Sequence, residues 1–159
     1  MRELAEAGIR DPRLQRLYAY WQERHVGARP PSRADLDPLD FPYAVGFVTL
    51  VDVEHDPLRF RFRLVASPVT QHLGYELTGK YLDEVPEPAM RGYLEESYRR
   101  VVAERCALHE RGERVLDRRI WRHESMLLPC CDAGGSVNMI ISARVTETPQ
   151  SLAEDGALD

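Results

Sequence analysis

Few residues in this chain have the type and spacing that chemistry needs. The neighbouring cysteines Cys130–Cys131 could suggest redox or metal chemistry, but metal sites favour cysteines spaced as CxxC. The pairs His109–Glu110 and His123–Glu124 lack the HExxH spacing of zinc enzymes. We therefore interpret all of these as residues of strands and turns, and the sequence predicts no metal site.

Catalytic residues are equally hard to place. None of the serines considered stands in the GxSxG setting of a nucleophile; they are Ser67, Ser97, Ser125 and Ser136. Asp52 is the nearest candidate for an acid–base group, if it faces a cavity. A carboxylate that faces solvent or pairs with Arg63 explains Asp52 better. We predict that the protein has no catalytic residue and is not an enzyme.

Tyrosines gather in the middle of the chain, where they could line a ligand cavity. Tyr75, Tyr81, Tyr93 and Tyr98 fall within one predicted helical region. Ordinary core packing is one interpretation, and a cavity whose polar-tipped rings orient a small ligand is the other. The candidate pocket residues are Phe62, Leu64, His72, Tyr75, Tyr81, Tyr98, Met126 and Met139.

The first element that must position these groups is a helix predicted over residues 12–25. Asp11 is a suitable N-cap, and Pro12 suits the first helical position. An apolar stripe at helical spacing follows; its members are Leu14, Leu17, Tyr18 and Trp21. The stripe either covers the domain's own sheet or packs across a two-fold interface, so we treat it as a candidate dimerisation helix.

The remaining elements are expected in the order of two strands, a helical block and three strands. The strands are expected at 47–53, 59–64, 107–116, 120–128 and 137–145, and the helices of the block at 69–73 and 89–105. The strict alternation of Arg59–Leu64 is typical of a half-buried strand. The last strand is the most apolar, which favours a central place in the sheet.

Composition and charge exclude several classes of function. The 159 residues, 43 % of them hydrophobic and 30 % charged, fit one globular domain. A formal net charge of −5 provides no general positive field for a nucleic acid backbone. Neither a secretory signal nor an apolar stretch of about 18 residues is present. With three cysteines in no framework spacing, we expect a cytoplasmic protein that binds neither nucleic acid nor membrane.

The element order and one motif resemble the PAS domain family. The stretch His72–Glu84 is similar to the PAS pattern LGY…EL.G+.L.E, with its middle shortened. The wider chain resembles the short single-domain PAS proteins common in alphaproteobacteria, over about residues 14–145. The matching residues are Trp21, Pro31–Asp35, Asp37–Pro38, Arg59–Val65, Leu77–Glu84 and Leu127–Pro129.

The resemblance implies an α+β fold with a five-stranded antiparallel sheet in the order 2-1-5-4-3. Helices would lie on one face, and the N-terminal helix would be an extension. The chain then divides into a helix and Pro-rich connector at 1–43, a PAS core at 44–147 and a flexible tail at 148–159.

The resemblance also implies a stand-alone sensory or interaction module in bacterial signalling, which binds a small ligand or a protein partner. A homodimer and a protein signalling partner are expected, because no output domain is recognised. Haem would need a histidine on the long helix, and light-sensing flavin a cysteine in an Asn-Cys-Arg-Phe run; both are absent. We therefore predict no cofactor and leave room for an unidentified small ligand. The alternatives are a cone-shaped α+β enzyme, resembling steroid isomerases, that uses Asp52, and a ligand-free adaptor.

Overall fold

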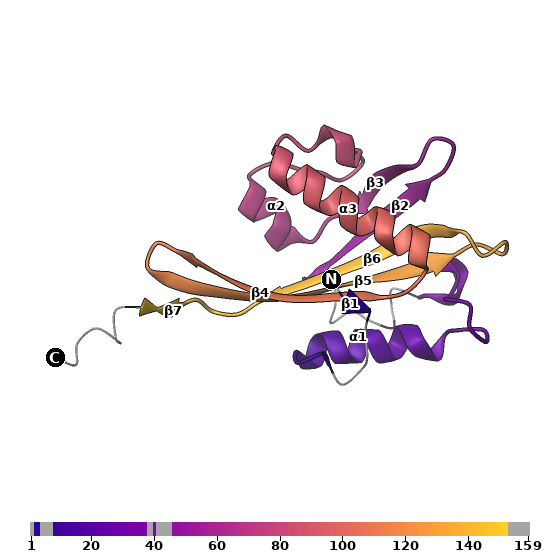
Figure 1. The fold of residues 1–159 in the computed structure, drawn as a ribbon, viewed down its shortest axis with the longest axis horizontal. Coiled ribbons are helices and arrows are strands. Elements are labelled where there is room, and N and C mark those ends of the chain that lie inside the picture. The colour runs from indigo at the N-terminus through magenta and orange to yellow at the C-terminus, as the bar shows by residue number, and fades with distance from the viewer. Residues whose placement is uncertain (1, 4–7, 38–39, 41–45, 153–159) are drawn as a thin grey trace.

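One antiparallel sheet organises the chain, and helices cover both of its faces in the computed structural model (Figure 1). The structure describes residues 2–3, 8–37, 40 and 46–152. The five long strands are β2 (Val48–Glu54), β3 (Arg59–Leu64), β4 (Leu108–Leu116), β5 (Arg119–Cys131) and β6 (Val137–Thr146). Two-residue strands, β1 (Arg2–Glu3) and β7 (Gln150–Ser151), pair with β4 and β5.

The strand order confirms the predicted topology. The path through the sheet is β1-β4-β5-β6-β2-β3, and β7 lies beside β5. When the five long strands are counted along the chain, this is the order 2-1-5-4-3. The most apolar strand, β6, lies between β5 and β2 as expected.

Helix α1 (Pro12–Glu23) covers one face of the sheet. The carboxylate of Asp11 caps it by accepting a hydrogen bond of 2.8 Å from the backbone N–H of Arg13. The apolar stripe is buried against the sheet of the same chain; its members are Leu14, Leu17, Tyr18 and Trp21. The indole Nε1–H of Trp21 donates a buried hydrogen bond of 2.8 Å to the carbonyl oxygen of Pro129 in β5.

The opposite face lies beneath α2 (Ser67–Leu73) and α3 (Pro88–Glu104), with a short 3-10 helix, Leu82–Glu84, between them (Figure 1). Gly74 ends α2 in the left-handed conformation, at φ +77°, which glycine adopts without steric cost. Tyr98 and Val101 of α3 are buried against the sheet. Prolines open both helices at a position where no N–H is needed.

The sheet is therefore buried on both faces, and two separate cores result. One core lies under α1 and includes Met126 and Ile141; the other lies under α2 and α3 and includes Leu127 and Ile140. Because successive strand residues point to opposite faces, neighbouring residues in β5 and β6 belong to different cores.

Several boundaries differ from those predicted. Helix α1 ends at Glu23 rather than His25, and β5 continues to Cys131. A 3-10 helix, Arg33–Asp35, interrupts the Pro-rich connector. Within the predicted tail, Gln150 and Ser151 pair with β5. The predicted boundary between 43 and 44 lies outside the described residues.

The β4–β5 hairpin extends beyond the helical layers as a projecting arm (Figure 1). Nine residue pairs join the two strands, from Leu108–Leu127 to Leu116–Arg119. No helix in the described part of the chain is long and apolar enough to cross a membrane.

Candidate functional site

A cavity of about 130 Å³ lies between the sheet and the α2–α3 layer. Its lining combines an apolar wall with hydroxyl groups and one guanidinium. The apolar residues are Phe47, Phe62, Val65, Val69, Leu77, Met90, Leu94 and Leu127. The polar residues are Thr49, Tyr93, Ser97, Tyr98, Ser125, Ser142 and Arg144.

Polar side chains cross the floor of the cavity on three neighbouring strands. Thr49 of β2 lies opposite Ser142 of β6, and Arg144 of β6 lies opposite Ser125 of β5. The buried Tyr98 reaches this row from α3, where Ser142 hydrogen-bonds to it. Burial raises the pKa of Tyr98, so its hydroxyl stays protonated and available as a donor.

The rim of the cavity carries charged and titratable groups. The hydroxyl of Tyr93 donates to the carboxylate of Glu110, and burial together with this bond raises the pKa of Tyr93 to about 12. Much of Arg144 is exposed, but partial loss of hydration lowers the pKa of its guanidinium, while Tyr93 and Glu110 oppose that change. An anionic group entering the rim would therefore meet a partly desolvated positive charge.

His123 stands beside this rim, on β5. An added Cβ on Gly112 would lie 2.5 Å from Cε1 of His123, so the imidazole occupies the space that a side chain at position 112 would need. Loss of hydration and the positive charge of Arg144 lower the pKa of His123 below 6.5. Glu110, with Oε1 4.0 Å from Nε2, opposes that change.

This shift predicts a pH dependence of stability. Because folding depresses the pKa of His123, the unfolded chain binds the proton more tightly. The contribution of His123 to stability is present above pH 6.5 and is lost as the pH falls through the folded pKa. His123→Phe keeps a neutral ring over Gly112, so its free energy of unfolding should fall less than that of the unsubstituted protein between about pH 7.5 and pH 5. Urea titrations at each pH measure the difference, and parallel losses in both proteins would contradict it.

The structure places only part of the predicted pocket set in the cavity. Phe62 and Tyr98 line it. Leu64 is 47 % exposed at the end of β3, where the register with β2 shifts between Leu50 and Val51. The side chain of His72 lies outside what the structure describes.

Two of the predicted tyrosines bond to surface carboxylates away from the cavity. The hydroxyl of Tyr75 donates to Glu87 at 2.6 Å, and this bond raises the pKa of Tyr75 to about 12. The hydroxyl of Tyr81 donates to Glu54 at 2.9 Å, while the Arg59 guanidinium lies 3.6 Å from the centre of its ring. Neither tyrosine is part of the cavity lining.

Placing Met126 and Met139 in the pocket was wrong, because both lie in the core under α1. The resemblance implied helices on one face of the sheet and an N-terminal helix as an extension. In the structure α1 covers the second face and packs on the set of β5 and β6 residues that includes Met126 and Met139, so Leu127 and Ser142 line the cavity instead.

The predicted dimerisation stripe is likewise buried within its own chain. Leu14 and Leu17 are 0 % exposed, and Tyr18 and Trp21 are 5 % exposed. Of the two interpretations of the stripe, the structure therefore shows the one in which it covers its own sheet. A homodimer stays a prediction that requires another surface.

Thr49, Ser142 and Arg144 were not singled out from the sequence, and Ser125 was considered there only as a nucleophile and not as a pocket residue. They alternate with apolar neighbours, as Ser142 and Arg144 do around Ala143. Period-two alternation is the only signal that they carry, and it does not distinguish a solvent-facing strand residue from one that faces a cavity.

The other residues considered for catalysis or metal binding do not form a site. Asp52 pairs with Arg63 at 3.0 Å, as predicted, and with Arg33 at 3.7 Å, and it is not part of the cavity lining. Cys130 and Cys131 are both free and buried, and burial raises the pKa of Cys130 to about 12. Among the described residues, no group of three or more potential ligands could hold a metal ion.

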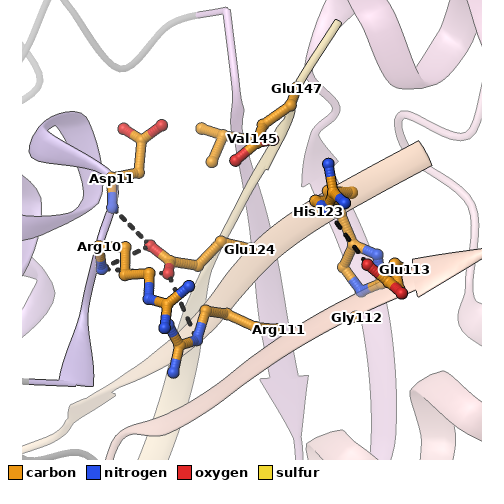
Figure 2. A pocket seen from close by; sticks show the side chains of 10 residues that line it. Arg10, Asp11, Arg111, Gly112, Glu113, His123, Glu124, Val145 and Glu147 are labelled. Carbon is orange, nitrogen blue, oxygen red and sulfur yellow. Dashed lines mark hydrogen bonds and ion pairs between the residues drawn. The ribbon is translucent and has the colours of Figure 1, made fainter. Parts of the chain in front are cut away.

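A second hollow of about 380 Å³ lies where the start of α1 meets β4 and β5 (Figure 2). Glu124 is its buried centre. Its carboxylate accepts hydrogen bonds from the backbone N–H groups of Arg10, at 3.1 Å, and Asp11, at 2.8 Å. Nε2 of His109 lies 3.4 Å from the same carboxylate, and Nε of Arg111 lies 4.0 Å from it. This carboxylate is satisfied by the chain itself, so we interpret the hollow as the attachment of α1 and not as a ligand site.

An antiparallel sheet covered by helices, with a small cavity under one helical layer, defines an α+β domain. The family model described as PAS domain matches residues 9–143, and the chain belongs to the PAS domain family. A search of curated protein sequences found no match.

Comparison with solved structures found similar domains. The PAS domain from Bordetella pertussis BvgS is similar at 23 % identity and a TM-score of 0.51, over 71 % of this chain and 88 % of that one. A light-oxygen-voltage domain studied with a flavin analogue is 10 % identical, with a TM-score of 0.47, over 69 % and 83 % of the two chains. A fungal light-oxygen-voltage photoreceptor is 16 % identical, with a TM-score of 0.41, over 84 % and 91 %. The likeness to the Bordetella pertussis BvgS domain concerns the fold alone.

Proposed function

We propose that this PAS domain is a sensory module whose α2–α3 cavity binds a small molecule with an apolar body and an anionic head group. The observation that carries the proposal is the arrangement of the lining. An apolar wall faces a polar row that ends at Arg144, whose guanidinium is partly desolvated. Such a site orients a ligand by few polar contacts and binds it by apolar burial.

The size of the cavity limits the ligand. About 130 Å³ is below the roughly 300–1,000 Å³ of pockets that hold drug-sized molecules. The proposal therefore concerns a molecule of a few heavy atoms, such as a short-chain carboxylate. The lining residues include no cysteine among those that the structure describes, and the absence of a flavin stays a prediction.

A bound ligand signals only if it binds two conformations with different affinity. Residues of α3 and of four strands meet at the cavity, so occupancy would favour one packing of α3 on the sheet. We propose that a protein partner detects this difference.

The alternatives receive less support. An enzyme of the steroid-isomerase type would need a carboxylate in the cavity, whereas Asp52 is paired with two arginines outside the lining. A ligand-free adaptor would leave the same cavity empty in solution, so it is an outcome of the following experiment.

Arg144→Gln should weaken the binding of short-chain monocarboxylates about 10-fold or more, because a hydrogen bond to a charged group is lost. The binding of the matching amides and alcohols should change little. Ser142→Leu fills the cavity floor and should abolish binding of all three sets. Calorimetric titration of each probe measures these effects, and Arg99→Gln, an exposed residue of α3 paired with Glu95, is the control.

Mass spectrometry of the native protein and of the material that it releases on denaturation should show a bound small molecule. The cavity proposal would be overturned if the unsubstituted protein and Ser142→Leu bound every probe with equal affinity and no small molecule were released on denaturation. That outcome would favour the ligand-free adaptor.

A further inference from the structure

Positive charge gathers on the arm that β4 and β5 form beyond the helical layers (Figure 1). Between residues 114 and 122 the sequence has four arginines and one aspartate, which gives this segment a net charge of +3. The whole chain carries −5, so the rest of it carries −8. The arm is therefore a basic segment on an acidic protein, and such a segment attracts partners of opposite charge.

Three of these arginines have no acidic partner within the part of the chain that the structure describes. Arg122 pairs with Glu113 at 3.1 Å. In contrast, the side chains of Arg114, Arg118 and Arg119 are exposed and form neither an ion pair nor a hydrogen bond with a described residue. Their guanidinium groups keep all their donors for a carboxylate, which an arginine can bind through two parallel hydrogen bonds.

Two of the unpaired arginines flank a tryptophan on one face of the arm. Arg114 lies opposite Trp121 across the β4–β5 ladder, and Arg119 lies two residues before Trp121 in β5. Because side chains alternate along a strand, all three share the face of the sheet that carries α3, which we call the α3 face. The indole N–H of Trp121 is buried and has no hydrogen-bond acceptor among the described residues. Arginine and tryptophan are enriched at the centres of protein–protein interfaces, where a partner can provide such an acceptor.

The turn at the tip holds the third arginine in a conformation that glycine adopts more easily. Asp117 and Arg118 connect β4 to β5 as a two-residue loop, with φ of +51° and +59°. Hairpin turns with positive φ at both positions favour glycine at the second one, because other residues meet a steric cost there. Arg118 makes no ion pair with a described residue that would offset this cost. The conformation therefore favours a role for this cation in contact with another molecule.

The positive surface of the arm is continuous with the rim of the cavity. Loss of hydration lowers the pKa of both His123 and Arg144, and the positive charge of Arg114 lowers both further. Arg114 therefore lies close enough to Arg144 to extend the positive charge of the rim onto the arm. A partner bound to the α3 face of the arm would lie beside the group that we propose for ligand binding.

The extent of this basic surface favours an acidic protein segment over a nucleic acid or a membrane. Glu110 and Glu113 precede it in β4, toward the body of the domain. A nucleic acid, with its closely spaced phosphates, would extend from the arm onto the acidic remainder of the chain. Entry into a bilayer would need apolar residues at the tip, which is instead formed by Asp117 and Arg118. A short acidic peptide segment meets neither obstacle.

We propose that the α3 face of the arm binds an acidic segment of a protein partner. Carboxylates of that segment would meet Arg114, Arg118 and Arg119, and an apolar side chain would pack on Trp121. This surface would serve the protein partner of the proposed function, and in that respect the inference rests on it. Binding to the arm does not require a ligand in the cavity, however, so the two proposals can fail separately.

Fluorescence anisotropy of the whole chain with a labelled peptide of about ten residues, mostly glutamate with a few leucines, tests the proposal. We expect a dissociation constant of about 10 to 100 µM that rises with salt. The same peptide with glutamine in place of glutamate should bind about 10-fold more weakly or less. Arg114→Gln and Arg119→Gln should each weaken binding of the acidic peptide about 3- to 10-fold. The control is Arg59→Gln, which removes an exposed cation from β3 at the opposite edge of the sheet and should leave binding unchanged.

Arg118→Gly separates binding from stability. Glycine favours the backbone of the turn, so this variant should unfold at the same urea concentration as the unsubstituted protein or at a higher one. It should nevertheless bind the acidic peptide about 3- to 10-fold more weakly, because the cation is lost. Ser142→Leu, which fills the cavity, should bind the peptide as the unsubstituted protein does, so failure at the arm is distinguishable from failure of the cavity proposal.

The proposal would be overturned if the acidic and glutamine peptides bound with equal affinity, or if all three arginine variants of the arm bound the acidic peptide as tightly as the unsubstituted protein. A single-stranded oligonucleotide and vesicles of anionic phospholipid are the remaining probes. If either bound more tightly than the acidic peptide, this basic surface would belong to that class of partner and the proposal would be wrong.

Discussion

Trp21→Ala should lower the free energy of unfolding by about 3 to 5 kcal/mol, the range for truncating a large buried aromatic residue. Trp21 is 5 % exposed in the core under α1, and it stacks on Tyr18 with a ring separation of 5.7 Å. Truncation leaves a cavity in this core. It also removes the hydrogen bond of 2.8 Å that the indole N–H donates to Pro129, so the buried carbonyl oxygen of Pro129 loses this donor.

Urea denaturation measures this loss, and Trp21→Phe is the matched control. Phenylalanine retains most of the ring but no N–H, so it should lose clearly less stability than alanine does. The loss should not depend on protein concentration, because α1 packs within its own chain. A midpoint of unfolding that falls on dilution would instead indicate that the stripe packs between two copies.

Glu124→Ala should lower the free energy of unfolding by about 2 to 4 kcal/mol. The carboxylate of Glu124 is 7 % exposed and accepts the backbone N–H groups of Arg10 and Asp11, which precede α1. Alanine leaves these two donors without their acceptor in a partly buried site, and it removes the carboxylate that lies 3.4 Å from Nε2 of His109. The start of α1 should then open more often than the rest of the domain.

Amide hydrogen exchange locates that effect. Exchange at Arg10 and Asp11 should accelerate in Glu124→Ala, while the central strands β5 and β6 keep their relative protection. Glu113→Ala removes a carboxylate from the adjacent strand, where it pairs with Arg122 in an exposed bridge of 3.1 Å. It should cost less than about 1 kcal/mol. Equal losses from the two substitutions would show that Glu124 does not anchor α1.

These two predictions concern the helix that distinguishes this domain from a sheet covered on one face only. Trp21 holds the middle of α1 to Pro129, and Glu124 holds its start. Both contacts end on β5, which also provides Ser125 and Leu127 to the cavity on the opposite face. The β5 residues that pack against α1 are therefore direct neighbours in the chain of the β5 residues that line the cavity on the opposite face.

Local patterns in the sequence were sufficient for the elements and their order. The Asp11–Pro12 cap and the alternation of Arg59–Leu64 each depend on neighbours in the chain. The motif His72–Glu84 and the element order together predicted the PAS fold with its 2-1-5-4-3 sheet, which the structure and the family match confirm.

Which residues share a site was decided only by the tertiary structure. A period of two divides β5 and β6 into two sets of side chains, but it does not state which set faces α1 and which faces α3. The apolar set with Met126 and Met139 lies under α1, and the mixed set with Ser125, Ser142 and Arg144 lines the cavity. The sequence by itself therefore determined the elements and their order, because those patterns are local, and the strand order of the sheet followed from the resemblance to the PAS domain family. The site depends on which elements cover each face of the sheet, and that depends on packing between residues far apart in the chain.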